Sequence, residues 1–325
     1  MYKWIDIFRW LMSLLVIAIH VNIFFPVTNS IGVQLFEDIT GIAVPFFFIT
    51  SGYFFVVSGA VERRQNYLLK LFKTYIMWTV IYLPFTFFYY IVQQQYNVFQ
   101  TFLYFMQRIL LVGENYYSFH LWYIHGLIFC VVLYVILLKI LKPQNKKMSV
   151  HMFIFAFALY VVGRALSFVA SQEKLYPIIS YIAKQYMNIF ITTRNGPLFG
   201  FCFFMIGVMF SQHQKICEII KKRICVVVFC VTAILNHLGC FFLLPLEVAA
   251  LWILILKLRA DIQIDTKIFR KASEMNYYVH MYPVSLFAII LPKQADFFFV
   301  LIICVLITII VSGIYIGSKI LRTKR

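Results

Sequence analysis

Long apolar runs recur along almost the whole chain, and no other feature restricts the possible folds as strongly. A transmembrane α-helix needs about 20 mainly apolar residues, and its backbone polar groups are bonded within the helix. The runs are continuous, whereas the strands of a transmembrane β-barrel alternate in polarity. The sequence therefore predicts an all-α polytopic membrane protein with about ten transmembrane helices, at residues 4–25, 39–58, 74–93, 119–140, 149–168, 197–212, 224–237, 239–256, 275–291 and 297–318.

The composition points to the same class of protein. Hydrophobic residues make up 63% of the chain and charged residues only 13%, and no soluble domain has such a balance. We expect one transmembrane domain over residues 1–325, with no soluble domain. The first run keeps Asp6 and Arg9 and lacks a small-residue cleavage site, so we expect a retained first span and not a signal peptide.

The distribution of positive charge predicts the orientation. The net charge of +17 could suggest nucleic-acid binding. With ten spans, however, 23 of the 29 Lys and Arg residues fall on the side of the two termini and six on the other side. The positive-inside rule then places both termini in the cytoplasm of a multi-pass plasma-membrane protein. The basic loops would contact anionic lipid headgroups, and we expect no nucleic-acid partner.

Two intervals between the runs have a distinct character. A polar loop with Glu37 and Asp38 is expected after the first span, and a basic segment with Arg63 and Arg64 before the third. Within the second run, Pro45 is expected to loosen the helix. Ser51 and Gly52 are small residues, so a neighbouring backbone can approach closely there.

No pattern indicates a metal or a soluble-enzyme site. The seven cysteines form no C-x-x-C pair, and the histidines lack metal-ligand spacing. G-x-S-x-G, P-loop and H-E-x-x-H motifs are also missing from the sequence. We therefore expect no metal site, no tightly bound cofactor and no disulfide framework. Any chemistry must come from polar residues of the apolar runs.

The first run carries three ionisable residues on one helical face. Asp6 and Arg9 are three residues apart and can pair. His20 follows Arg9 by eleven residues, so it lies on nearly the same face, about 16 Å further along. Ionisable groups inside a membrane helix usually face a partner or a water-filled cavity. A snorkelling Arg9 with a structural His20 is the alternative, but the three together favour a functional cavity.

Other polar residues lie at the ends of the runs or inside them. Lys70 and Lys73 are three apart, and could bind a phosphate or be ordinary cytoplasmic lysines. Tyr277 and His280 share one face with Ser273, and His280 taken alone reads more readily as a structural residue. The remaining candidates are Ser51 in the second span, His120 and the interfacial anchor Trp122 at the start of the fourth, Arg194 and Asn195 in the turn before the sixth, and the mid-membrane acid Glu247, a candidate partner for a buried base.

Several of these patterns resemble those of the acyltransferase family 3 integral membrane proteins. The first-helix pattern of that family is Arg, ten residues and His, commonly with an acid three residues before the Arg, as in Asp6, Arg9 and His20. Its second-helix pattern, roughly DxFFxxSGF, looks like VPFFFITSGYFF here, where Val44 and Pro45 replace the usual polar start.

Two further motifs extend the resemblance over nearly the full chain. The family has Arg-x-x-Arg before its third span, where this chain has Lys70 and Lys73. Lysine keeps the charge but not the fork geometry of arginine. The late family motif S-x-x-x-Y-x-x-H is matched by Ser273, Tyr277 and His280.

A branch of the same family is more similar still. The segments VPFFFITSGYFF, FHLWYIHG, TTRNGPLF and SEMNYYVHMYP resemble the membrane domain of the vancomycin-resistance serine racemases. In those proteins the domain is thought to take up serine for a fused racemase. We recognise no racemase domain in this sequence.

The family resemblance implies a membrane O-acyltransferase. Such an enzyme moves an acyl group, often acetyl, from cytoplasmic acyl-CoA to a hydroxyl of an envelope carbohydrate. By this resemblance Arg9, Lys70 and Lys73 would bind the phosphates of the co-substrate CoA, Asp6 would orient Arg9, and His20 would act as general base. Arg194 and Asn195 would meet the acceptor from outside, and the other candidates would lie on the acceptor side or support the site. Serine transport is the second hypothesis and a non-catalytic scaffold or sensor the third, and the oligomeric state is left open.

Overall fold

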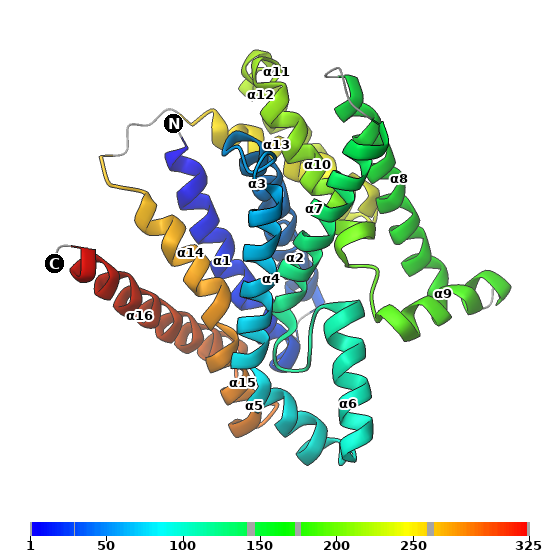
Figure 1. The fold of residues 1–325 in the computed structure, drawn as a ribbon, viewed down its shortest axis with the longest axis vertical. Coiled ribbons are helices and arrows are strands. Elements are labelled where there is room, and N and C mark those ends of the chain that lie inside the picture. Colours follow the sequence, from blue (N-terminus) through cyan, green and yellow to red (C-terminus); the bar gives the residue numbers. More distant parts are fainter. Residues whose placement is uncertain (1, 29, 142–146, 173–176, 259–262, 324–325) are drawn as a thin grey trace. The chain divides into compact units, whose positions relative to one another are not determined.

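The computed structural model describes residues 2–28, 30–141, 147–172, 177–258 and 263–323, and every regular element within these ranges is a helix (Figure 1). Each of the ten predicted spans coincides with at least one helix. Among the described residues, five helices are long and apolar enough to cross a membrane: Lys3–Phe24, Gly32–Val57, Phe119–Leu141, Val150–Ala170 and Phe297–Ser318. The all-α membrane class is therefore confirmed, whereas the number of ten spans and the cytoplasmic termini stay predictions.

The chain divides into two compact units, residues 1–47 with 220–325 and residues 48–219. The first unit contains α1 (Lys3–Phe24), α2 (Ser30–Gly41), the start of α3 (Ala43–Val57), α12 (Lys222–His237), α13 (Leu244–Leu256), α14 (Lys267–Val279), α15 (Met281–Ile290) and α16 (Phe297–Thr323). The second contains the rest of α3, then α4 (Arg64–Ile81), α5 (Leu83–Phe87), α6 (Val98–Gln107), α7 (Trp122–Leu141), α8 (Lys147–Ala170), α9 (Pro177–Phe190), α10 (Phe201–Gln212) and α11 (Gln214–Ile219). Short 3₁₀ or π-helical turns at 88–93, 108–112, 119–121, 196–200 and 241–243 extend several of these helices.

Prolines mark two breaks in the predicted spans. The third span bends by 54° between α4 and the helix that starts at Leu83, where Pro84 has no N–H to donate. The ninth span stops at Val279 and restarts at Met281. Pro283 cannot donate to the carbonyl of Val279, four residues earlier, so the ladder of helical hydrogen bonds is interrupted next to His280.

Two segments that we expected outside the spans are helical. The polar loop after the first span is α2, and the basic segment with Arg63 and Arg64 leads directly into α4. Tertiary contacts hold α2 in place: the ring of Phe36 lies 5.5 Å from that of Phe297, and Asp38 pairs with His237. The sequence shows the polarity of this segment but not these distant partners, which are about 200 residues or more away.

In the second unit, two glycines let α3 and α10 pack at close range. A Cβ atom on Gly52 would lie 2.0 Å from the carbonyl oxygen of Phe204, and one on Gly207 would lie 1.9 Å from that of Ile49. Neither position leaves room for a side chain. The close approach expected at the Ser51–Gly52 pair is therefore confirmed.

In the first unit, α1, α14 and α16 lie side by side (Figure 1). α12 packs on α13, and α1 also contacts α13, α15 and α2. Helix α1 is thus the centre of this unit. Its neighbours α14 and α16 supply most of the polar partners described below.

Candidate active site

Four contacts, in the same order along both segments, join α1 to α14 and to Thr266 and His280, the residues that flank α14. The hydroxyl of Thr266 donates to Asp6 at 3.3 Å, and that of Ser273 donates to the carbonyl of Arg9 at 3.0 Å. Asn276 then meets Ser13, and His280 meets His20. Since the residue numbers rise together, α1 and α14 run in the same direction. Alternating spans predict this for the first and ninth.

The deepest of these contacts joins two buried imidazoles. His20 is 6% exposed and His280 is fully buried. Nε2 of His280 lies 3.3 Å from Nδ1 of His20, and the ring centroids are 4.9 Å apart. The Tyr277 ring lies 6.4 Å from that of His280. The structure therefore brings His20, His280 and Tyr277 of the sequence motifs together.

Backbone carbonyls determine the tautomer of each imidazole. Nδ1 of His280 lies 2.8 Å from the carbonyl oxygen of Asn276, and Nδ1 of His20 lies 2.8 Å from that of Val16. A carbonyl oxygen only accepts, so both Nδ1 atoms carry hydrogen. In the neutral rings Nε2 is then the basic nitrogen. Nδ1 of His20 has one hydrogen, which is shared between the carbonyl oxygen of Val16 in the shorter contact and Nε2 of His280, at 3.3 Å, in the longer one. The lone pair of His20 is on its own Nε2.

The acid of the first-helix motif lies at the other end of the same helix pair. Asp6 is 7% exposed and accepts from Thr266. The positive charges of Arg270 and Arg9 both act on its carboxyl group, Arg270 more strongly. Asp6 therefore interacts with a cation of α14 as well as with Arg9 of its own helix. The sequence spacing indicated only the second of these.

A polar cluster that the sequence analysis missed lies between Arg9 and His20. Nδ2 of Asn276 donates to the hydroxyl of Ser13 at 3.1 Å, and the hydroxyl of Ser312 donates to Oδ1 of Asn276 at 2.8 Å. All three residues are at most 2% exposed. One signal was available: Asn276 is three residues from Ser273 and four from His280, so it shares their helical face.

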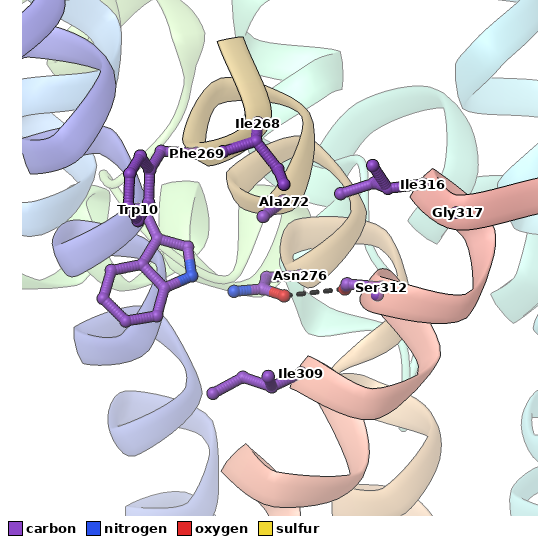
Figure 2. A pocket seen from close by; sticks show the side chains of 10 residues that line it. Trp10, Ile268, Phe269, Ala272, Asn276, Ile309, Ser312, Ile316 and Gly317 are labelled. Carbon is purple, nitrogen blue, oxygen red and sulfur yellow. Dashed lines mark hydrogen bonds between the residues drawn. The ribbon is translucent and has the colours of Figure 1, made fainter. Parts of the chain in front are cut away.

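A cavity of about 370 Å³ lies beside this cluster, between α1, α14 and α16 (Figure 2). Trp10, Phe269, Ala272 and several residues of α16 line it, and all of its lining residues are uncharged. Figure 2 shows the amide of Asn276 reaching from α14 with its oxygen toward Ser312. The cavity thus has an apolar wall and one polar corner.

Glu247 contacts an amide and not one of the buried histidines. It is 6% exposed and accepts a short hydrogen bond from Nδ2 of Asn236. The charge of Asp38 also acts on it. Asp38 itself lies 2.5 Å from Nδ1 of His237, and the carbonyl of His237 accepts from Gln34 at 2.8 Å. Glu247 therefore belongs to a separate polar group formed by α2, α12 and α13.

The candidates of the fourth span lie among aromatic rings of the second unit. The hydroxyl of Ser51 lies 2.8 Å from that of Tyr123. The buried ring of His120 lies 5.0 Å from that of Tyr82. Trp122 is half-buried, and its ring lies 6.0 Å from that of Phe48. The structure surrounds each of these side chains with its own aromatic or hydroxyl neighbours.

The turn before the sixth span uses Asn195 as a helix cap. Its Oδ1 accepts from the backbone N–H of Leu198 at 2.9 Å, and its Nδ2 donates to the hydroxyl of Tyr186 at 2.6 Å. A turn followed by a helix start is what TTRNGP predicts. The neighbouring Arg194 is exposed, and the acceptor role of both residues stays a prediction.

The candidate phosphate-binding lysines are exposed on α4. Lys70 and Lys73 share this exposed stretch with Leu69 and Phe72, which are 51% and 53% exposed. Apolar side chains and lysines thus alternate there, as at the edge of a membrane. A role of the lysines in donor binding stays a prediction.

The cysteines and the other side chains that can bind metals are dispersed over the described ranges. These contain no group of three or more His, Cys, Asp or Glu side chains that could hold a metal ion. All seven cysteines are free, and five are buried.

Curated relatives cover part of the chain. An amino-acid racemase of Enterococcus faecalis is 26% identical over 224 residues, which are 66% of this chain and 29% of that protein. A serine/alanine racemase of Enterococcus gallinarum is 28% identical over 220 residues, which are 66% of this chain and 30% of that protein. The chain thus matches less than a third of the length of each relative. No solved structure shows significant similarity.

A family-wide comparison covers far more of the sequence. The model of the acyltransferase domain of family 3 matches residues 2–317. The match includes Asp6, Arg9 and His20 of the first helix, Lys70 and Lys73 of α4, and the motif that ends at His280. The chain therefore belongs to acyltransferase family 3, a family of membrane acyltransferases.

Proposed function

We propose that this protein is a plasma-membrane O-acyltransferase that moves an acyl group, acetyl in the simplest case, from cytoplasmic acyl-CoA to a hydroxyl of a cell-envelope carbohydrate. The observation that carries the proposal is the buried pair of His20 and His280, within a chain that matches the acyltransferase domain over residues 2–317. The pair supplies what acyl transfer needs most, a neutral imidazole with a defined basic nitrogen.

In this proposal Nε2 of His20 takes the proton of the acceptor hydroxyl. The hydroxyl oxygen attacks the thioester carbonyl carbon, so a C–O bond forms and the C–S bond breaks. The CoA thiolate leaves and receives the proton from His20, which returns to its neutral form. His280 supports the charged intermediate state, because its Nε2 accepts from Nδ1 of His20 while its own Nδ1 donates to a carbonyl.

Cations of the chain are suited to the donor. CoA carries several phosphate groups, and both arginine and lysine bind phosphate. Arg9 lies one turn after the acid Asp6 in α1, and the exposed Lys70 and Lys73 lie on α4. Each is a candidate contact for the donor phosphates.

The racemase relatives suggest a second candidate function, transport of an amino acid. Two amino-acid racemases and a serine/alanine racemase match two thirds of this chain. By analogy the domain would carry a small amino acid such as serine across the membrane. It would then need the buried polar groups but no acyl donor.

Acetyl-CoA binding to the purified, lipid-reconstituted protein separates the two functions. We expect saturable binding that weakens strongly in Arg9→Ala and Lys70→Ala and is unchanged in Lys184→Ala, a lysine outside the motifs. The structural reason is the loss of one phosphate contact. Absence of binding in folded wild-type protein, together with serine uptake into the same vesicles, would replace the acyltransferase proposal by the transport function.

A further inference from the structure

Asn276 connects three helices through one side chain. Its amide nitrogen donates to Ser13 of α1, and its amide oxygen accepts from Ser312 of α16 (Figure 2). Its own backbone carbonyl accepts from Nδ1 of His280. The residue is 1% exposed.

The direction of each hydrogen bond around this amide is determined. The hydroxyl of Ser13 donates its only hydrogen to the carbonyl of Trp10 at 2.6 Å, so toward Asn276 it can only accept. The hydroxyl of Ser312 donates to Oδ1 of Asn276. The site therefore requires a donor on the side of α1 and an acceptor on the side of α16. A neutral amide meets both requirements, whereas a carboxylate offers only acceptors.

The amide also fixes the register of α14 along α1, and so determines that the two histidines lie opposite each other. Ser13 precedes His20 by two turns on α1, and Asn276 precedes His280 by one turn on α14. The hydrogen bond from Asn276 to Ser13 restricts sliding of the two parallel helices along each other, because it fixes one point of contact between them. A slide by one turn of either helix, about 5.4 Å, would separate the imidazoles completely.

We infer that Asn276 is a positioning residue for acyl transfer: its neutral amide locks α14 onto α1 and α16 in the register that places Nε2 of His280 against Nδ1 of His20. The inference rests on the proposed function for its catalytic consequence. Its structural part, the state of the histidine pair, is independent of any activity. Asn276 touches no reacting atom and acts through the two helices.

Asn276→Asp is the informative substitution, because it keeps the shape and removes the donor. A protonated aspartic acid can donate to Ser13 as the amide does, but the ionised form cannot. The residues that line the cavity carry no charge. The titratable residues nearest to this position along the packed helices include Glu274, Tyr277 and His280 next to Asn276, Arg9 and His20 on either side of Ser13, and Tyr315 after Ser312. We expect the variant to approach wild-type acylation at low pH and to lose about a hundredfold in kcat as its carboxyl ionises, with the KM for acyl-CoA little changed.

Two matched variants separate positioning from packing. Asn276→Ala should lower kcat at every pH without the new pH-dependent loss. In Asn115→Asp the new carboxylate is equally buried in the second unit but still accepts from Tyr90, so the rate should follow the wild-type pH profile. A pH profile of Asn276→Asp that parallels the wild type would overturn the inference.

A second measurement keeps the two proposals distinguishable. The ¹⁵N NMR spectrum of imidazole-labelled protein reports the tautomers of His20 and His280 without any substrate. We expect wild type to show hydrogen on Nδ1 of both rings, and Asn276→Asp at high pH to lose this pattern for His280. If wild type catalyses no acylation but the spectrum changes as expected, the function fails and the positioning role stands. An unchanged spectrum overturns the positioning role whatever the activity.

Discussion

Nε2 of His280 lies 3.3 Å from Nδ1 of His20, although 260 residues separate them in the sequence. The contact depends on two parallel helices that keep almost the same register from Thr266 to His280. In each ring a backbone carbonyl accepts the hydrogen of Nδ1, so the contact joins the lone pair on Nε2 of His280 to the N–H of His20. The pair therefore resembles a relay, in which one imidazole orients the next.

Substitution of the two histidines should have unequal effects on acylation. His20→Ala removes the base, and we expect a loss of 10²-fold to 10⁴-fold in kcat. His280→Ala leaves the base but not its orientation, so a smaller loss of about tenfold to a hundredfold is expected. Acylation by membranes with matched protein levels measures both. Wild-type rates in His280→Ala would show that the contact has no catalytic use.

Close packing of α3 on α10 predicts intolerance at two glycines. Gly52→Ala or Gly207→Ala would place a Cβ atom about 2 Å from a backbone carbonyl oxygen, and overpacking of this kind costs about 1–3 kcal/mol. The melting temperature of the purified protein should fall in both variants. Gly41→Ala is the control, because a Cβ atom there meets nothing within 4 Å. Equal melting temperatures in all three variants would contradict the packing.

Much of the first-helix site could be predicted because its spacing is local. The eleven-residue step from Arg9 to His20 defines a face of one helix, and Ser273 and His280 define a face of another. Each face carries the contacts to the other helix. Periodicity identifies a face but not the neighbour that covers it, so the pairing of the two histidines appears only in the folded chain.

The residues that sequence reasoning missed are neutral. Ser13 and Ser312 look like ordinary small residues of apolar helices, and Asn276 lies between the motif residues Ser273 and Tyr277 without belonging to the motif. A search for ionisable side chains passes over all three. Glu247 shows the opposite case, since a conspicuous acid turns out to contact the amide of Asn236. The helix α2 was missed because its stabilising partners, His237 and Phe297, lie far along the chain.

The connection between α6 and α7 predicts a pH dependence of stability. The side chain of Glu114 is 14% exposed and lies 3.8 Å from Arg108. Burial raises the pKa of its carboxyl to about 7, against a smaller opposing effect of Arg108. The folded protein therefore holds this proton more tightly than the unfolded chain, so stability falls as the pH rises from about 4.5 through 7.

Glu114→Gln should remove this contribution, because the amide stays neutral at every pH. The melting temperature of the wild type minus that of the variant should be constant below pH 4.5 and should fall as the pH approaches 8. The rise of the pKa of Glu114 from 4.5 to about 7 corresponds to a free energy on the order of 3 kcal/mol. Arg108→Gln is the companion variant: without the opposing cation the pKa of Glu114 rises further and the loss extends to higher pH. A melting-temperature difference that does not change with pH would show that the carboxyl of Glu114 has the same pKa in the folded and unfolded protein, which contradicts the prediction.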